Sequence, residues 1–166
     1  MPGPSPRLPG GLAGVVVARN EAGHIAACLA SLAGVDDLVV IDDASTDETA
    51  AIAREAGARV VAGAGDLGTL RELGRRSTPC AWIVLLDADE RLPPGGLDRL
   101  RSAIEAAPAR VAGFRLPIRS HLGERFLRFG GYYPAARVRL VRREAARWPP
   151  ARVHERPELA GAVAHL

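Results

Sequence analysis

Acidic residues follow two apolar runs in this sequence, in a pattern that suggests a ligand site. Asp42 and Asp43 end one run, and Asp87 and Asp89 end the other. Continuous aliphatic runs are typical of buried parallel strands, and open α/β sheets bind ligands beyond the carboxyl ends of such strands. Carboxylates placed there can accept hydrogen bonds from a nucleobase or a ribose, and two of them can share one Mg²⁺ or Mn²⁺. A surface turn rich in acids is the alternative explanation.

Strands and helices alternate over the N-terminal half, which predicts the sheet that would position these carboxylates. The sequence predicts strands at 15–17, 38–41, 59–62 and 81–86, with helices at 25–34, 45–57 and 67–76 between them. Residues 45–48 have capping-box spacing at the start of the second helix. This alternation favours an α/β fold with a mostly parallel sheet and helices on both faces. A helix at 93–106 and strands at 111–118 and 136–141 then predict a less regular, more antiparallel part.

The length of 166 residues is that of a single domain, which we expect over residues 12–166. Residues 1–11 contain four prolines and three glycines and are predicted to form a disordered arm. Cys28 and Cys80 lack metal-ligand spacing, so both are expected to be buried free thiols. No apolar run reaches the roughly 18 residues of a membrane-spanning helix, and no leader pattern begins the chain, so we expect a cytoplasmic protein.

Charge is distributed unevenly along the chain, although the net charge is only +3. Residues 1–90 hold 7 Arg and 13 acids, whereas residues 91–166 hold 15 Arg and 6 acids. The basic half could attract nucleic acid, an anionic membrane or phosphorylated small molecules, or could be a solvated arginine-rich face. Nucleic acid is the least favoured partner, because aromatic residues for base stacking make up only 4% of the chain.

A glycine pattern offers a competing interpretation. Gly63, Gly65 and Gly68 match the dinucleotide-binding fingerprint between a predicted strand and a predicted helix, and Asp87 ends the next strand. The motif follows the third strand, however, whereas polar clusters already follow two other strands. In a chain with 18 glycines such a match arises readily by chance. A NAD-binding Rossmann-like protein stays as an alternative.

Six motifs, in order along the chain, resemble those of family 2 glycosyltransferases with the GT-A fold. Three of them lie at predicted strand ends, at residues 15–21, 39–47 and 85–90. The others, at residues 130–134, 137–140 and 153–155, are similar to the branch related to bacterial lipopolysaccharide-core β-glucosyltransferases. The resemblance covers about residues 12–158 and implies a GT-A sheet that binds a nucleoside diphosphate sugar.

The resemblance implies which residues hold the donor, for which a UDP-sugar is favoured. Ala18, Asn20, Glu21 and Asp43 are expected to contact the base and the ribose. These positions follow the first and second predicted strands, so the nucleoside would lie across their carboxyl ends.

Asp87 and Asp89 correspond to the family's DxD motif. The resemblance implies that this pair holds Mg²⁺ or Mn²⁺ at the diphosphate, with Asp89 as the principal ligand. Arg71 matches a position whose basic side chain faces the donor. Glu72 stands where the family usually has Asn, so Arg71 could instead pair with Glu72.

The reaction implied is a single inverting displacement at the anomeric carbon, which needs a base for the acceptor hydroxyl. Glu155 is the candidate base. His154 could hold metal or phosphate, could exchange roles with Glu155, or could be an ordinary surface histidine. Arg137 and Arg139 are two residues apart on a predicted strand, so they would share a face and could clamp diphosphate or a phosphorylated acceptor. The loop at 130–133 would lie beside the acceptor.

The resemblance also implies a glycan or lipid-linked acceptor and a role in cell-envelope polysaccharide or lipopolysaccharide synthesis. The basic half could then contact the inner face of the membrane peripherally. Members of this branch continue well beyond the His-Glu pair, whereas this sequence stops at Leu166. A missing segment or a partner chain could complete the acceptor side, or the chain could be a non-catalytic module that binds nucleotide sugars.

Overall fold

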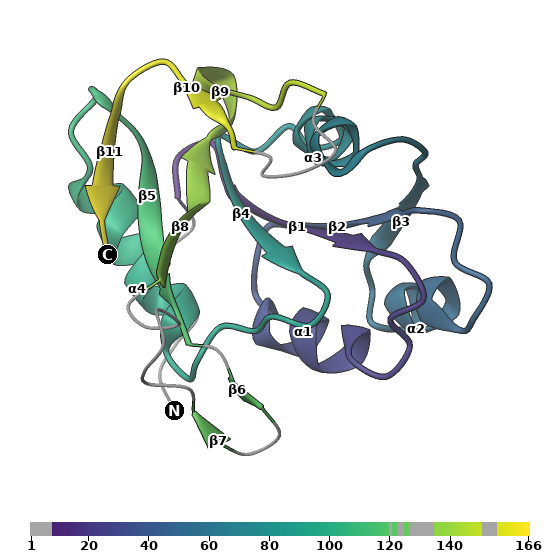
Figure 1. The fold of residues 1–166 in the computed structure, drawn as a ribbon. Helices are drawn as coiled ribbons and strands as arrows, with labels where there is room; N and C mark the ends of the chain where they lie inside the picture. The colour runs from purple at the N-terminus through teal and green to yellow at the C-terminus, as the bar shows by residue number, and fades with distance from the viewer. Residues whose placement is uncertain (1–7, 120, 123–124, 127–134, 151–155) are drawn as a thin grey trace.

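The computed structural model describes residues 8–119, 121–122, 125–126, 135–150 and 156–166. Its main sheet has seven strands in the order β11-β5-β8-β4-β1-β2-β3, with helices on both faces (Figure 1). This architecture confirms the α/β fold with a mainly parallel sheet that the alternating sequence predicts.

The N-terminal half builds the parallel part of the sheet. The strand β1 (Leu12–Ala18) pairs with β2 (Asp37–Asp42) on one side and with β4 (Trp82–Asp87) on the other. At the edge, β3 (Arg59–Ala62) pairs with β2. The chain therefore leaves β1 in one direction and returns on its other side, and open α/β sheets bind ligands at such a switch point.

Two apolar layers enclose these strands. On one face, α1 (Ile25–Ser31), α2 (Thr49–Glu55) and α4 (Gly96–Ala106) pack against the sheet (Figure 1). On the other face, α3 (Leu67–Arg76) packs against β1 and β2. Burial on both faces explains why the strands read as continuous apolar runs. Among the described helices, none is long and apolar enough to cross a membrane.

The C-terminal half completes the sheet with one antiparallel strand. β8 (Ala135–Arg142) runs antiparallel to both β4 and β5 (Val111–Ile118), as the sequence predicts for this part. β11 (Ala162–His165), which the sequence does not predict, pairs in parallel with β5 at the edge. The remaining elements are short: β6 (His121–Leu122), β7 (Arg125–Phe126), the 3₁₀ turn η1 (Arg143–Ala145), β9 (Ala146–Arg147) and β10 (Glu158–Leu159).

The end of the predicted N-terminal arm is ordered. Leu8 is 4% exposed and belongs to the core. The carbonyl oxygens of Gly10 and Gly11 accept hydrogen bonds from the N–H groups of Ala81 and Trp82. The prediction of disorder is therefore wrong for residues 8–11, because one buried leucine and the β4 backbone hold them; residues 1–7 lie outside the described part.

Both cysteines are buried and free, as predicted. Burial, together with the negative charges of Glu90, Asp87 and Asp89, raises the pKa of the Cys28 thiol to about 12. The thiol of Cys28 is therefore protonated at neutral pH and unreactive.

Gly74 allows α3 to approach the sheet closely. A Cβ atom at this position would lie 2.4 Å from Cγ1 of Val15. We expect Gly74→Ala to lower the free energy of unfolding by about 1–3 kcal/mol, because overpacking outweighs the better helix propensity of alanine. Urea denaturation measures the change. Gly23→Ala is the matched control, since nothing lies within 4 Å of a Cβ there; equal stabilities of the two variants would contradict the close packing.

Candidate functional site

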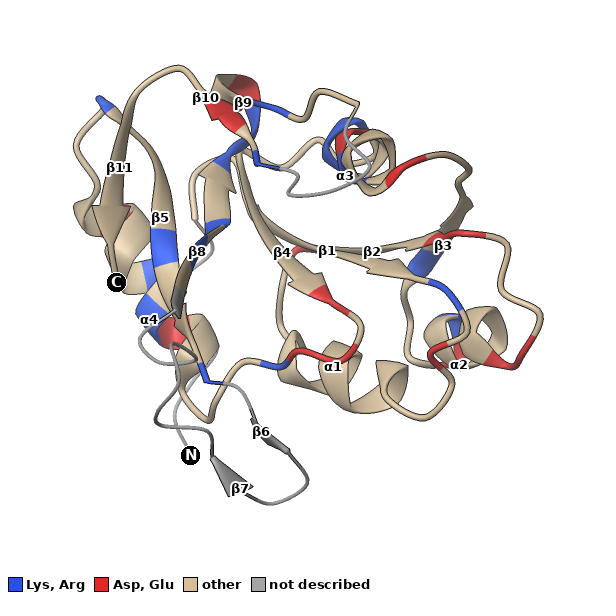
Figure 2. Cartoon of the chain, viewed as in Figure 1, with Lys and Arg blue, Asp and Glu red and all other residues tan. Residues whose placement is uncertain are grey.

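A cavity of about 310 Å³ opens at the carboxyl ends of β1, β2 and β4. We call it the strand-end pocket; its lining consists of Val17, Ala18, Arg19, Glu21, Asp43, Gly65, Leu67, Leu70, Asp87, Ala88 and Asp89. The topology brings together five residues that the sequence assigned to the donor site: Ala18, Glu21, Asp43, Asp87 and Asp89. Figure 2 shows acidic positions at the tip of β4 and in the turn that follows it. Residues distant in sequence thus form one acidic pocket at the switch point.

Polar contacts tie together the two loops that border the pocket after β1 and β2. The N–H of Asn20 donates to Oγ of Ser45 at 3.0 Å, and the Oδ1 of Asn20 accepts from the N–H of Thr46 at 2.8 Å. Asn20 and Ala44 adopt left-handed backbone conformations, with φ of 54° and 52°. Such conformations are uncommon for non-glycine residues, less so for asparagine than for alanine, and persist where surrounding contacts hold them. Asn20, expected to contact the donor, here uses its amide oxygen to join the loops.

Further contacts between these two loops stand in place of the predicted capping box. The helix α2 begins at Thr49, and Glu48 at its N-cap makes no side-chain capping bond. Instead, Oγ1 of Thr49 accepts from the N–H of Glu21 at 2.7 Å. Asp47 accepts from the N–H of Ala22 at 3.1 Å, and its hydrogen bonds, above all that with the Thr49 hydroxyl, lower its pKa. The prediction of a helix from residue 45 is wrong, because these side chains bond across to the other loop.

Asp87 lies between two buried arginines. Its Oδ1 accepts from Nη2 of Arg71 at 2.7 Å, and its Oδ2 accepts from Nη2 of Arg139 at 2.6 Å. Burial alone would raise the pKa of Asp87, but the positive charges of Arg139 and Arg71 outweigh it and lower the pKa. Both carboxylate oxygens are already engaged within the protein. This geometry favours an organising role for Asp87 over direct metal ligation.

Arg71 pairs with Asp87, whereas Glu72 has other partners. The Nη2 and Nε atoms of Arg75 donate to Glu72 at 2.6 and 2.9 Å, and the N–H of Trp148 donates to it at 3.1 Å. Glu72 therefore links α3 to the segment after β9. The alternative in which Glu72 diverts Arg71 from the pocket is not what the structure shows.

Glu72 should make the stability of the protein depend on acidic pH. Burial raises its pKa, but the hydrogen bonds from Arg75, the Trp148 N–H and Arg76 outweigh burial and lower the pKa from 4.5 to about 2. Because the folded pKa lies below the unfolded one, the stabilisation is full above about pH 4.5 and is lost as the pH falls towards 2. We expect Glu72→Gln to flatten this acid decline in urea-denaturation experiments. Glu105→Gln, an exposed control on α4, should keep the wild-type profile; an equally steep profile for Glu72→Gln would refute the assignment.

Asp89 is the exposed acid of the strand-end pocket. It makes no hydrogen bond or ion pair with any residue that the structure describes. Within the same described part, no group of three or more His, Cys, Asp or Glu residues could hold a metal by itself. Mg²⁺ is commonly bound through one or two carboxylates together with substrate phosphates. Asp89 fits that kind of site, in which the ligand supplies the other oxygens.

A β-bulge brings the side chain of Arg139 to Asp87, which lines the strand-end pocket. Its neighbours Val138 and Leu140 pair with consecutive residues of β5, so Arg139 is the extra residue on β8. A bulge interrupts regular side-chain alternation and can redirect a side chain. Arg139 is buried against Asp87, whereas Arg137 is exposed. The predicted clamp of Arg137 with Arg139 is therefore wrong, because it assumed an unbroken strand.

Two residues of the site carried no sequence prediction. Arg19 lines the pocket, with its Nη1 3.4 Å from Oδ2 of Asp43. Glu90 accepts from the N–H of Asp87 at 3.0 Å and from Nη2 of Arg139 at 2.6 Å. Glu90 stands three residues after Asp87, which is the spacing of a capping box. That spacing is the sequence signal from which the contact between Glu90 and the Asp87 N–H could have been predicted.

The candidate catalytic base, its alternative and the predicted acceptor loop all fall outside the part of the chain that the structure describes. Glu155, His154 and residues 130–134 lie outside the described residues. Their roles stay predictions from the family resemblance.

The glycine motif lies where a dinucleotide would bind poorly. It follows β3, the edge strand, rather than a strand beside the switch point. Asp66 caps α3 by accepting from the N–H of Thr69 at 2.9 Å. A carboxylate thus already occupies the helix N-terminus at which a pyrophosphate would bind. The geometry does not favour the NAD-binding alternative.

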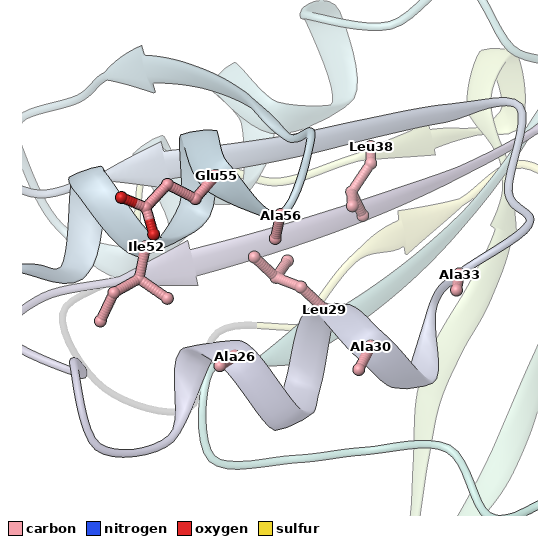
Figure 3. Close-up of a pocket in the computed structure, with 8 residues that line it drawn as sticks. All are labelled: Ala26, Leu29, Ala30, Ala33, Leu38, Ile52, Glu55 and Ala56. Atoms are coloured by element: carbon pink, nitrogen blue, oxygen red, sulfur yellow. The ribbon is translucent and has the colours of Figure 1, made fainter.

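A larger hollow of about 420 Å³ lies between α1 and α2 (Figure 3). Its lining is apolar except for one acid: Ala26, Leu29, Ala30, Ala33, Leu38, Ile52, Ala56 and Glu55. A diphosphate requires charged or hydrogen-bonding partners, which this lining does not supply. The strand-end pocket is therefore the better candidate for the donor.

Comparison with known proteins finds relatives that are longer than this chain. A TPR repeat-containing protein from Synechococcus elongatus is 38% identical over 97 residues, which are 57% of this chain and 24% of that protein. An uncharacterized glycosyltransferase from Rickettsia felis is 38% identical over 80 residues, which are 46% of this chain and 28% of that protein. The chain thus spans about a quarter of the length of these curated relatives.

Solved structures share the fold. Glucosyl-3-phosphoglycerate synthase from Mycobacterium tuberculosis, in complex with Mn²⁺, UDP and glucosyl-3-phosphoglycerate, is 25% identical with a TM-score of 0.55, over 63% of this chain and 43% of that one. The same synthase in complex with UDP is 22% identical with a TM-score of 0.61, over 81% of this chain and 57% of that one. The likeness confirms the GT-A-like fold.

The sequence model of one family matches most of the chain. That model, described as glycosyl transferase family 2, matches residues 15–152, which include the parallel strands and the strand-end pocket. The chain belongs to glycosyl transferase family 2.

Proposed function

We propose that this chain is a glycosyltransferase that binds a nucleoside diphosphate sugar in the strand-end pocket and transfers the sugar to a hydroxyl acceptor. The observation that carries the proposal is the meeting of Ala18, Glu21, Asp43 and Asp89 at the carboxyl ends of β1, β2 and β4. The family match and the UDP complexes of the mycobacterial synthase support a UDP-sugar as the donor.

The charges of the pocket support a requirement for a divalent cation. Among the described residues that line the pocket, Arg19 is the one basic residue, against the four acids Glu21, Asp43, Asp87 and Asp89. Although Arg71 and Arg139 neutralise Asp87, the other carboxylates would repel an anionic diphosphate. Asp89 would hold Mg²⁺ or Mn²⁺, which when bound offsets the charge of the diphosphate leaving group. The mycobacterial synthase was solved with Mn²⁺ or Mg²⁺ and UDP, which agrees with this choice.

The transfer would be an inverting displacement that uses Glu155 as the base, with His154 as the alternative. A phosphoglyceric acid complex of the mycobacterial synthase supports a small phosphorylated acceptor, whereas the resemblance to lipopolysaccharide-core enzymes supports a glycan or lipid-linked acceptor. A glycan or lipid-linked acceptor would place the protein in cell-envelope synthesis, with peripheral membrane contact through its arginines. Transfer assays with both kinds of acceptor separate these two possibilities.

Isothermal titration calorimetry with UDP, GDP, dTDP and NADH, each with and without Mn²⁺, tests the proposed donor. We expect UDP to bind with Mn²⁺ and to bind much more weakly without it. Binding of NADH that is unaffected by a chelator would overturn the proposal in favour of the dinucleotide alternative. A preference for GDP or dTDP would keep the reaction class and change the base.

A non-catalytic nucleotide-sugar-binding module is the second candidate. Tight UDP-glucose binding without transfer and without donor hydrolysis would select it.

A further inference from the structure

Glu90 closes the turn after β4 twice. The N–H of Glu90 donates to the carbonyl oxygen of Asp87 at 2.9 Å, and the N–H of Asp87 donates to Oε2 of Glu90 at 3.0 Å. Between them, Ala88 is 3% exposed and belongs to the core, whereas Asp89 is exposed and lines the strand-end pocket. The turn therefore anchors one middle residue in the core and presents the other to the pocket.

Arg139 joins the two ends of this turn. Its Nη2 lies 2.6 Å from Oδ2 of Asp87 and 2.6 Å from Oε1 of Glu90, and its side chain is only 2% exposed. The bulge in β8 brings it there from the strand beside β4. Arg71 approaches Oδ1 of Asp87 from α3 on the other side. Two carboxylates thus face two guanidinium groups, and all four carboxylate oxygens have a partner.

We propose that Glu90 and Arg139 are positioning residues that hold the Asp87–Glu90 turn, so that Asp89 is the one carboxylate of the turn left free for a divalent cation. The inference deepens the proposed function and rests on it for the identity of the ligand. A metal ligand held in place before the metal arrives loses little freedom on binding, which strengthens the site. Arg139 thus acts on the donor through the turn, rather than as the phosphate clamp that the sequence suggested.

Amide hydrogen exchange tests the turn without any ligand. We expect the Asp87 amide to exchange at least about 10-fold faster in Glu90→Ala, because its hydrogen-bond acceptor is removed. Glu90→Gln keeps an acceptor and should show a smaller change. Glu105→Ala, on α4, is the control and should leave the exchange of the Asp87 amide unchanged. The exchange of the β1 amides should be the same in all variants. Unchanged exchange of Asp87 in Glu90→Ala would overturn the proposed role of Glu90.

Calorimetry with UDP and Mn²⁺ tests the link to Asp89. Loss of a residue that orients a metal ligand commonly weakens metal affinity by about 10–100-fold, and we expect that loss in Glu90→Ala. Arg139→Lys should show it too, since a lysine keeps the charge but not the planar, multi-donor geometry. UDP binding without Mn²⁺ should not change; equal losses with and without Mn²⁺ would indicate a merely structural role and overturn the inference.

The two measurements separate this inference from the proposed function. If the unaltered chain binds no UDP with Mn²⁺, the proposed function and the ligand part of the inference both fail, while hydrogen exchange still decides whether Glu90 holds the turn. If UDP binding is normal but Glu90→Ala alters exchange without weakening Mn²⁺-dependent binding, the proposed function stands and the positioning role is overturned.

Discussion

Replacing Asp89 by alanine should abolish the Mn²⁺-dependent part of UDP binding and leave the fold intact. Asp89 is exposed and has no hydrogen-bond partner among the described residues, so its removal should change the free energy of unfolding by less than about 0.5 kcal/mol. As the proposed direct ligand it should matter more than an orienting residue, so we expect at least about a 100-fold loss of affinity in the presence of Mn²⁺.

The comparison of affinities with and without Mn²⁺ makes this test specific. Removing Asp89 also removes one negative charge from an acidic pocket, so UDP affinity without metal should stay equal or rise slightly. Glu105→Ala, which removes an exposed acid on α4, should match the unaltered chain under both conditions. An Asp89→Ala variant with full Mn²⁺-dependent affinity would rule out Asp89 as the ligand.

Replacing Glu155 by glutamine should abolish transfer while preserving donor binding. A general base contributes typically about 10²–10⁴-fold to a rate, because it takes the proton from the attacking hydroxyl. Glutamine has a similar shape and cannot accept that proton, so UDP affinity with Mn²⁺ should be unchanged. Release of UDP from UDP-glucose, with phosphoglyceric acid as the first acceptor to be tried, measures the transfer rate.

His154→Asn provides the matched comparison at the adjacent position. A loss of transfer in Glu155→Gln with a much smaller loss in His154→Asn would support Glu155 as the base. The reverse order would move the base to His154, and retained transfer in both variants would place it elsewhere in the chain. If the unaltered chain binds UDP-glucose but transfers nothing, the non-catalytic module is the correct function.

Local sequence patterns predicted most elements because the residues that define them are contiguous. β3, α3 and β5 have the bounds that apolar runs and helical spacing indicate. Errors occur at helix starts: α2 begins at Thr49, and α4 begins at Gly96 rather than at the preceding prolines. At α2 the capping signal failed because Ser45 and Asp47 bond to the other loop, a contact that no local pattern contains.

The acidic strand ends of the site were also readable from the sequence. Parallel strands end at the same edge of a sheet, so Asp43 and Asp89 had to lie near one another once the alternation was recognised. The interruption of β8 was not readable. Residues 137–140 alternate regularly between arginine and apolar residues, so the sequence gives no sign of the bulge. The effect of the bulge on Arg139 depends on the partner strand β5.

The sequence by itself determined the α/β class, the family and the positions of the strand-end acids, because these depend on local hydrophobic patterns and contiguous motifs. Only the tertiary structure decided what each acid can do. Arg71 and Arg139 come from two distant elements and occupy both oxygens of Asp87, which leaves Asp89 as the exposed acid of the turn. Pairing of buried charges requires proximity in space, and that proximity is created by the packing of α3 and β8 beside β4.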